Sequence, residues 1–266
     1  MAIVNATPDS FSDGGMLYKN NKVDRDVTLL RLERVSSEGA DIVDVGGEST
    51  RPGASGVSLQ EEMDRVLPVV EWALTETDLA VSVDTSSPEL MLAAASQGAH
   101  MINDVRALSK PGAIKAAVKV GLPVCLMHMQ GTPESMQQSP SYEAVVNDVA
   151  QYLQQRIDEC LAAGVKAERI CVDPGFGFGK TLQHNLMLLA HLGKLQELAC
   201  PVLVGLSRKS MIDRLLNREV DDRLYASLGL GLMSLERGAA ILRVHDIRAT
   251  RDIIDSFIAV TDCASG

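Results

Sequence analysis

The chain has 266 residues, of which 46% are hydrophobic and only 3% aromatic, and it carries a formal net charge of −10. This length is enough for a large core of aliphatic side chains, whereas the acidic balance and the lack of a Lys/Arg run argue against nucleic-acid binding. There is no apolar stretch of about 18 residues, and none of the five cysteines forms a Cys-x-x-Cys pair. We therefore expect a soluble, cytoplasmic protein without disulfides, structural zinc or membrane contact.

Eight short apolar runs alternate with amphipathic segments along the chain. The predicted strands are Ala2–Asn5, Asp41–Val45, Ala80–Asp84, Met101–Asn103, Val124–His128, Ile170–Asp173, Val202–Gly205 and Ile241–Val244. The predicted helices are Val23–Ser37, Leu59–Leu74, Pro88–Gln97, Pro111–Val120, Tyr142–Ala163, Leu182–Leu195, Leu224–Glu236 and Arg248–Val260. Eight strand-then-helix units without a long linker favour one α/β domain over residues 1–266, a single (β/α)₈ TIM barrel. An open doubly wound sheet is the alternative, because periodicity alone does not show closure.

Each predicted strand stays apolar until its end, where polar side chains appear. These residues are Asn5, Asp44, Asp84, Asn103, Asp104, His128, Asp173, Arg243 and His245, with Ser207-Arg208-Lys209 after the seventh strand. In a (β/α)₈ barrel the carboxyl ends of the strands and the loops after them form the active site. We therefore expect these side chains to converge on one mouth of the barrel.

A polar residue at a strand end can instead cap the next helix. Ser86 or Ser87 can cap the helix after Asp84, which leaves Asp84 for function. For Asp44 both interpretations stay open, since it precedes Gly46-Gly47 and can brace that turn. Asn103 and Asp104 point in opposite directions if the strand continues, and we expect Asn103 to face the barrel axis.

The last two strand ends resemble an anion site. Lys209 and Ser210 follow a glycine and a serine after the seventh strand, while Arg243 and His245 are two positions apart on the eighth and share one face. Barrels often hold phosphate after strands seven and eight, and the Arg guanidinium has forked donors that suit phosphate oxygens.

The segment from Asp173 to Thr181 is rich in glycine and nearly matches a nucleotide P-loop. Pro174 stands where that motif needs glycine, and Lys180 stands where the dinucleotide fingerprint needs its third glycine. We expect these glycines to let the backbone approach a flat ligand, with Asp173 at the base of the loop.

Over nearly its whole length the sequence resembles the bacterial dihydropteroate synthases. The matching segments are Asn5–Gly15, Asp44–Gly53, Val83–Thr85, Ile102–Asp104, Met127–Gly131, Asp173–Lys180, Ser207–Ser210 and Arg243–Asp246. The resemblance implies a transferase that joins 6-hydroxymethyl-7,8-dihydropterin diphosphate to 4-aminobenzoate and releases diphosphate and 7,8-dihydropteroate. It also implies Mg²⁺ on the diphosphate and a homodimer.

The same resemblance assigns roles to individual residues. The pterin set is Asp84, Asn103, Asp173 and Lys209; the diphosphate set is Asn5, Arg51, Arg243 and His245, with Asn5 at the metal; the 4-aminobenzoate set is Phe11, Thr50, Pro52, Lys209 and Ser210. The resemblance also assigns the catalytic roles, to Asp84, Lys209, Arg243 and His245. In the implied reaction diphosphate leaves first, Asp84 stabilises the pterin cation, and the arylamine then attacks.

Two long loops, residues 7–21 and 46–58, are expected to act as lids over the substrates. The second loop carries the usual Ser-Thr-Arg-Pro-Gly sequence without an insertion, which predicts inhibition by sulfonamides.

Two other functions compete with the main interpretation. A pterin-binding methyltransferase that serves a corrinoid should lack the diphosphate residues, and a binding protein without turnover should have lost loop residues such as Arg51.

Overall fold

The computed structural model describes residues 1–7, 17–19, 22–49, 56–132 and 135–265, and its centre is a ring of parallel strands. In sheet order these strands are β1 (Ala2–Asn5), β4 (Ile42–Gly46), β5 (Ala80–Asp84), β6 (Met101–Asp104), β7 (Val124–Met127), β8 (Ile170–Asp173), β9 (Val202–Val204) and β10 (Ala239–Leu242). Val244, just after β10, pairs in parallel with Ala2 of β1 and donates its N–H to the Met1 carbonyl at 3.0 Å. This pairing closes the barrel and confirms the predicted fold.

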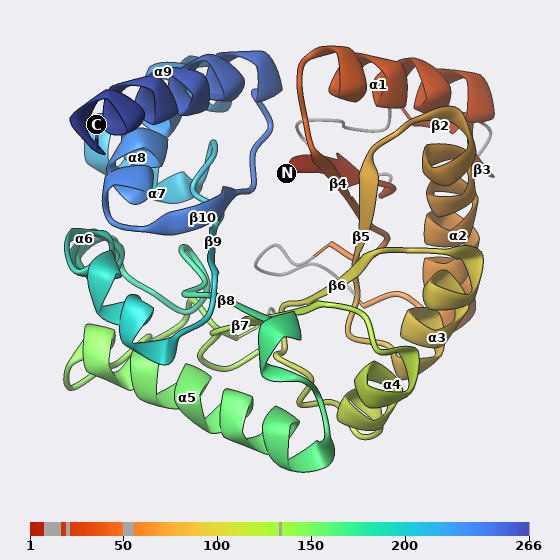
Figure 1. Ribbon diagram of the computed structural model, residues 1–266, viewed down its shortest axis with the longest axis horizontal. Coiled ribbons are helices and arrows are strands. Elements are labelled where there is room, and N and C mark those ends of the chain that lie inside the picture. The colour runs from red at the N-terminus through yellow and green to blue at the C-terminus, as the bar shows by residue number, and fades with distance from the viewer. Residues whose placement is uncertain (8–16, 20–21, 50–55, 133–134, 266) are drawn as a thin grey trace.

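Helices cover the outside of the barrel, and in Figure 1 they surround the strands on every side of the view. They are α1 (Arg25–Ser37), α2 (Leu59–Glu76), α3 (Pro88–Gln97), α4 (Ala113–Val120), α5 (Val145–Ala163), α6 (Leu182–Ala190), α7 (Ser210–Leu216), α8 (Leu224–Glu236) and α9 (Ile247–Ser265). Side-chain oxygens of Asp24 and Ser58 cap the starts of α1 and α2. Glycines in the left-handed conformation, Gly98, Gly121 and Gly164, end α3, α4 and α5.

Several boundaries differ from the predicted ones. The expected helix to Leu195 stops at Ala190, and a 3-10 helix (Leu192–Leu198) follows it. The sequence prediction missed α7 and also a hairpin of two-residue strands, β2 (Tyr18–Lys19) and β3 (Lys22–Val23), because such short elements show no periodicity. The last barrel strand ends at Leu242, so Arg243 and His245 lie in the segment after it and not on it.

The barrel interior has an apolar bottom and a polar top. Met1, Met101, Cys125, Cys171 and Leu203 form a buried cluster, with Ile42 and Ile241 packed against it. Several of these residues lie two positions before a polar strand end, as Ile42 does before Asp44, Met101 before Asn103 and Cys171 before Asp173. Side chains in a strand alternate between its two faces, so each inward apolar residue is followed by an inward polar one.

Two further features concern the cysteines and the helices. All five cysteines are free, and Cys125 and Cys171 are buried among apolar side chains. Among the described helices, none combines the length and the apolar character needed to cross a bilayer.

Candidate active site

A cavity of about 480 Å³ opens at the polar end of the barrel. Six of the predicted site residues line it: Asn5, Asp84, Lys209, Ser210, Arg243 and His245. Asn103 and Asp173 are buried and do not line it directly. Phe11, Thr50, Arg51 and Pro52, together with most of both predicted lid loops, fall outside the described residues. A volume of this size suits a drug-sized organic molecule.

Arg243 lies between two carboxylates at the base of the cavity. Its Nε donates to Asp44 Oδ2 at 2.7 Å, and its second terminal nitrogen donates to Asp84 Oδ2 at 3.0 Å. The Asn103 amide donates to the same Asp44 oxygen at 3.0 Å. Asp44 is fully buried, and its other oxygen, Oδ1, has no hydrogen-bond partner among the described residues. Asp44 therefore contacts the site through its side chain, which decides between the two interpretations of this residue.

The pKa of the Asp84 carboxyl is raised well above the ordinary value for aspartate. Burial raises its pKa to about 7, with smaller contributions from neighbouring carboxylates, and the Arg243 guanidinium opposes the shift. A carboxyl with this pKa is partly protonated near neutral pH. Perturbed acids of this kind concentrate at functional sites, which supports a functional role for Asp84.

The loop after Asp84 is held by a buried carboxylate that sequence reasoning did not single out. Glu62, at the start of α2, accepts hydrogen bonds from the Thr85 hydroxyl at 2.6 Å and the Ser87 hydroxyl at 2.8 Å. Ser87 occupies the N-cap position of α3 but makes no side-chain cap bond, because its hydroxyl is committed to Glu62. The expectation that Ser86 or Ser87 caps this helix through its side chain is therefore wrong.

The side chains of Asn103 and Asp104 point in different directions, and Asn103 faces the barrel interior, as expected. Asn103 faces Asp44 in the barrel interior, whereas Asp104 accepts from the Arg106 and Leu108 backbone N–H groups, both at 2.8 Å. Asp104 thus organises the loop after β6, and Asn103 is the member of the pair that faces the site.

Lys209 reaches across the cavity to the glycine-rich loop. Its ammonium group donates to the Phe176 carbonyl and lies 4.7 Å from the centre of the Phe178 ring. Burial lowers the Lys209 pKa to about 8, and the nearby Asp173 carboxylate opposes that shift. Asp173 itself accepts from the Gly175 N–H at 2.7 Å, and burial raises its pKa. Lys209 therefore connects the seventh loop to the Asp173 loop.

Two glycines of this loop, Gly175 and Gly179, are needed for close packing within the protein. A Cβ on Gly175 would lie 1.9 Å from the His128 carbonyl oxygen, and one on Gly179 would lie 2.7 Å from the Gln130 carbonyl oxygen. Both glycines have positive φ angles. Gly177 lines the cavity, and the approach of a flat ligand to this backbone stays a prediction.

Lys180, at the end of the same loop, is a buried structural residue, and burial lowers its pKa well below the ordinary value. Its ammonium donates to the carbonyls of Gly175 at 2.9 Å and Phe178 at 3.0 Å, and lies 2.9 Å from His128 Nδ1. The sequence analysis placed His128 among the residues converging on the mouth, but it does not line the cavity. His128 and Lys180 together fix the shape of the loop that carries Phe176 and Phe178.

His245 is a neutral histidine on the cavity wall. Burial, together with the guanidinium groups of Arg243 and Arg208, lowers its pKa to about 3. Arg208 is itself held by Asp246 through two hydrogen bonds of 2.9 and 2.6 Å. The ring Nδ1 lies 3.1 Å from the Ser207 hydroxyl.

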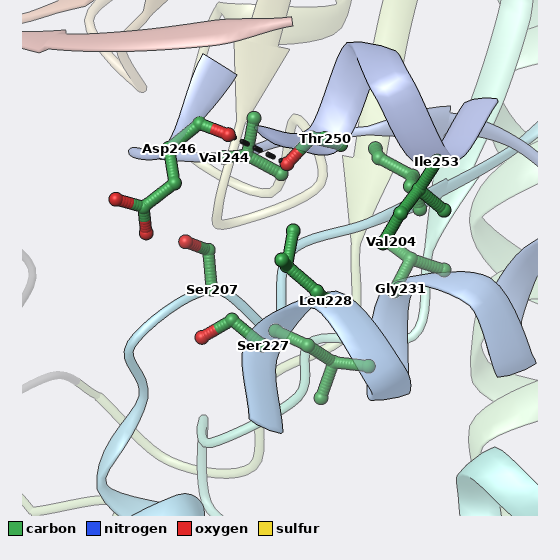
Figure 2. A pocket seen from close by; sticks show the side chains of 11 residues that line it. Val204, Ser207, Ser227, Leu228, Gly231, Val244, Asp246, Thr250 and Ile253 are labelled. Atoms are coloured by element: carbon green, nitrogen blue, oxygen red, sulfur yellow. Dashed lines mark hydrogen bonds between the residues drawn. The ribbon is translucent and has the colours of Figure 1, made fainter. Parts of the chain in front are cut away.

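A second, much smaller cavity lies beside Ser207, between the barrel wall and helices α8 and α9 (Figure 2). Its volume of about 10 Å³ is about that of one water site. Val204, Leu228, Gly231 and Ile253 give it mainly apolar walls. It is too small for an organic substrate, so the larger cavity is the candidate active site.

Comparisons with known proteins agree with this geometry. Residues 1–245 match the family model described as pterin binding enzyme. The dihydropteroate synthase of Haemophilus influenzae is 50% identical over 254 residues, covering 96% of this chain and 90% of the relative. A Yersinia pestis dihydropteroate synthase structure with a sulfonamide drug complex has a TM-score of 0.94 at 48% identity, covering 98% of this chain and 93% of the other.

A Xanthomonas albilineans dihydropteroate synthase in complex with 7,8-dihydropteroate has a TM-score of 0.85 at 44% identity, with 98% of this chain and 92% of the other covered. The similarity therefore spans the barrel and the strand ends that carry the cavity. This chain belongs to the pterin-binding enzymes and, within them, to the dihydropteroate synthases, which are transferases.

Proposed function

We propose that this chain transfers the dihydropterin-methylene group from 6-hydroxymethyl-7,8-dihydropterin diphosphate to 4-aminobenzoate, releasing diphosphate and 7,8-dihydropteroate. The observation that carries the proposal is the composition of one cavity. Its wall combines a carboxyl of raised pKa, Asp84, with the cationic and neutral donors Arg243, Lys209 and His245. This combination suits a substrate with a flat heterocycle at one end and an anionic leaving group at the other.

The pterin end would lie over the polar top of the barrel interior. A pterin edge presents N–H donors, which the Asp173 and Asp84 carboxylates can accept, and acceptors, which Asn103 and Lys209 can serve. Asp173 keeps an oxygen without a hydrogen-bond partner among the described residues, since Gly175 takes only Oδ1. The hydrogen bonds of Asn103 and Arg243 to Asp44 hold these groups in place before a ligand arrives.

The diphosphate would bind to Arg243 and His245, with Arg51 as the second cation assigned by the family resemblance. Among the described residues no three His, Cys, Asp or Glu side chains gather as a metal site. Mg²⁺ does not need such a cage, because it often takes one or two protein oxygens and substrate phosphates. The Asn5 amide lines the cavity and makes no side-chain hydrogen bond within the described part of the chain, so it fits a single Mg²⁺ ligand. Bound Mg²⁺ would neutralise charge on the departing diphosphate.

The arylamine would enter beside Lys209 and Ser210, at the outer side of the cavity. Ser210 is exposed and Lys209 carries a positive charge that suits the carboxylate of 4-aminobenzoate. The resemblance adds Phe11, Thr50 and Pro52 to this subsite. It therefore includes loop residues, consistent with the predicted lids.

The substitution needs little proton transfer before bond breaking. The bond between the methylene carbon and the diphosphate oxygen breaks, and its electron pair leaves with the diphosphate beside Arg243 and His245. The remaining positive charge spreads into the pterin, where ionised Asp84 stabilises it. The arylamine nitrogen then forms the new bond to carbon and loses one proton to solvent. No strong general base is required, because the attacking amine is neutral.

The test is release of diphosphate from the pterin diphosphate with Mg²⁺, measured with and without 4-aminobenzoate. Formation of dihydropteroate, with diphosphate release that continues beyond a first turnover only when 4-aminobenzoate is present, would support the proposal. Pterin binding without release would indicate the non-catalytic alternative, and methyl transfer from methyltetrahydrofolate to a corrinoid would indicate the methyltransferase. Kinetics that require the arylamine before bond breaking would overturn the proposed order of steps.

Sulfonamides should compete with 4-aminobenzoate at the Lys209–Ser210 subsite. The related Yersinia pestis enzyme has been solved with a sulfonamide drug complex. A rise in the apparent KM for 4-aminobenzoate with increasing drug, at constant kcat, is the expected result. Turnover unaffected by the drug would contradict this assignment.

We also propose a homodimer formed through α7, α8 and α9. Large apolar side chains exposed on these helices are Leu215, Leu216, Tyr225, Leu232, Met233, Ile258 and Val260. Such a concentration of exposed apolar groups is typical of an interface. Sedimentation at several protein concentrations tests it, and a monomer throughout would refute it.

The cytoplasmic location and the single domain over residues 1–266 remain predictions. The single domain is supported by the strands from Ala2 to Leu242, which belong to one ring.

A further inference from the structure

Ser207 contacts His245 in two ways. The hydroxyl oxygen accepts a hydrogen bond from the His245 backbone N–H at 3.2 Å and lies 3.1 Å from ring nitrogen Nδ1. Ser207 is 6% exposed and lies in the loop directly after β9, whereas His245 follows β10. Both residues line the active-site cavity. The pair therefore joins two neighbouring strand ends at the cavity wall.

The hydrogen-bonding capacity of the Ser207 hydroxyl indicates which ring nitrogen of His245 carries the proton. A serine hydroxyl has one hydrogen to donate and two lone pairs that can accept. The His245 backbone N–H takes one lone pair, and among the described residues no other acceptor for the hydroxyl hydrogen lies within hydrogen-bond distance. With a hydrogen on Nδ1, the Ser207 hydroxyl hydrogen would have only water in the adjoining cavities as a partner. The contacts within the described part of the protein therefore favour donation from the hydroxyl to Nδ1.

The ring is neutral when it makes this contact. Burial, then the positive charges of Arg243 and Arg208, lower the His245 pKa to about 3. The charged groups that face the ring are Arg243, Arg208, Arg31 and Asp246. A neutral imidazole has one N–H, so a ring that accepts at Nδ1 carries its proton on Nε2. Within the described part of the chain, Nε2 has no hydrogen-bond partner.

We propose that Ser207 is a positioning residue, which holds His245 in the tautomer protonated at Nε2 so that a neutral ring donates a hydrogen bond to a diphosphate oxygen. The identity of that acceptor rests on the proposed function, whereas the tautomer rests on the Ser207 contacts alone. A donor that is already oriented needs no reorganisation when the leaving group gains charge. The neighbouring guanidinium groups then supply the charge, and His245 supplies a directed donor.

Nitrogen NMR of protein labelled at its histidines tests the tautomer in the free enzyme near neutral pH. The His245 signals are identified by their loss in His245→Gln. In the wild type, Nδ1 should be unprotonated and hydrogen-bonded, and Nε2 protonated. Ser207→Ala should shift the Nδ1 signal away from that of a hydrogen-bonded acceptor. Ser207→Thr should restore it, because the small cavity beside Ser207 leaves room for the added methyl group (Figure 2).

The matched control is Ser234→Ala, which removes another buried serine hydroxyl. Ser234 lies in α8, does not line the cavity, and donates to the Leu230 carbonyl at 2.7 Å. Calorimetry with inorganic diphosphate and Mg²⁺ then measures binding. Ser207→Ala should weaken it about tenfold, the loss of roughly one hydrogen bond to a charged group. Ser207→Thr and Ser234→Ala should leave it unchanged.

A wild-type proton on Nδ1 would overturn the proposal, as would a Ser207→Ala variant with wild-type signals and wild-type affinity. Failure of the wild type to bind diphosphate would instead overturn the proposed diphosphate site and the acceptor assigned to Nε2. The NMR signals of the free protein distinguish these cases, because they report on the Ser207 contact without any ligand.

Discussion

Replacing Asp84 by Asn should make the protein more stable at high pH while removing its activity. Asp84 has a pKa of about 7 because burial penalises its carboxylate, and Arg243 compensates only in part. A carboxyl with a folded pKa above its unfolded value stabilises the fold most at low pH, and that contribution is lost as pH rises through the folded pKa. The wild type should therefore lose stability across this window.

The magnitude follows from the same shift. Each pH unit below the folded pKa is worth about 1.4 kcal/mol, so from about pH 5 to about pH 8 the wild type should lose roughly 2.5 kcal/mol through Asp84. Asp84→Asn cannot ionise and should lack this term. Arg243 keeps its bond to Asp44 in the variant, so no cation is left unpaired.

Urea denaturation of both proteins at several pH values, at equal protein concentration, measures the difference. Other titrating groups are common to both chains and cancel in the subtraction. Asp78→Asn is the control, since this exposed carboxylate lies just before the same strand. Parallel stability profiles for the wild type and Asp84→Asn would refute the argument that Asp84 is an electrostatically strained group.

Three further predictions concern the groups around Asp84. The rate kcat/KM should rise through about pH 7 as Asp84 ionises and fall above about pH 8 as Lys209 loses its proton; Lys209→Arg should move only the upper limb to higher pH, as pH–rate profiles would show. Lys180→Met should destabilise the fold by about 3–5 kcal/mol in urea denaturation, because buried carbonyls lose their donor; a loss below about 1 kcal/mol would contradict this. Glu62→Gln should lower kcat about tenfold, since one oxygen that accepts from Thr85 or Ser87 becomes a donor; unchanged kcat would show that this clamp does not position Asp84.

The barrel was predictable because its signal repeats. Eight apolar runs, each ending in a polar residue, predict both the strand count and the end at which Asp84, Arg243 and His245 meet. The hairpin at Tyr18–Lys19 and the short helix α7 were not predictable, because their few residues carry no period. The end of β10 was predicted two residues late, since the apolar Val244 follows Arg243 beyond Leu242.

Within the site, sequence position reveals which residues gather but not which atoms they contact. Asp44 could have braced a glycine turn, and only the structure shows it bonded to Arg243, which is 199 positions away in the chain. Glu62 gave no signal, because an acidic residue in the first turn of a helix has an ordinary explanation in the helix dipole. For Lys180, its place in a glycine-rich run indicated a ligand loop, whereas its burial among carbonyls shows a structural role.

The charges in the barrel interior explain how one site can serve an anionic leaving group and a cationic intermediate. Among the residues that the structure describes there, a single guanidinium, that of Arg243, is bonded to two carboxyl groups, those of Asp44 and Asp84. The neighbouring carboxylates of Asp44, Asp104 and Glu62 add to the effect of burial in raising the pKa of Asp84. On the proposed roles, the pterin cation formed when diphosphate leaves would restore the balance, while the diphosphate remains beside His245 at the mouth. The same feature that destabilises the empty site would then stabilise the charge that develops during the reaction.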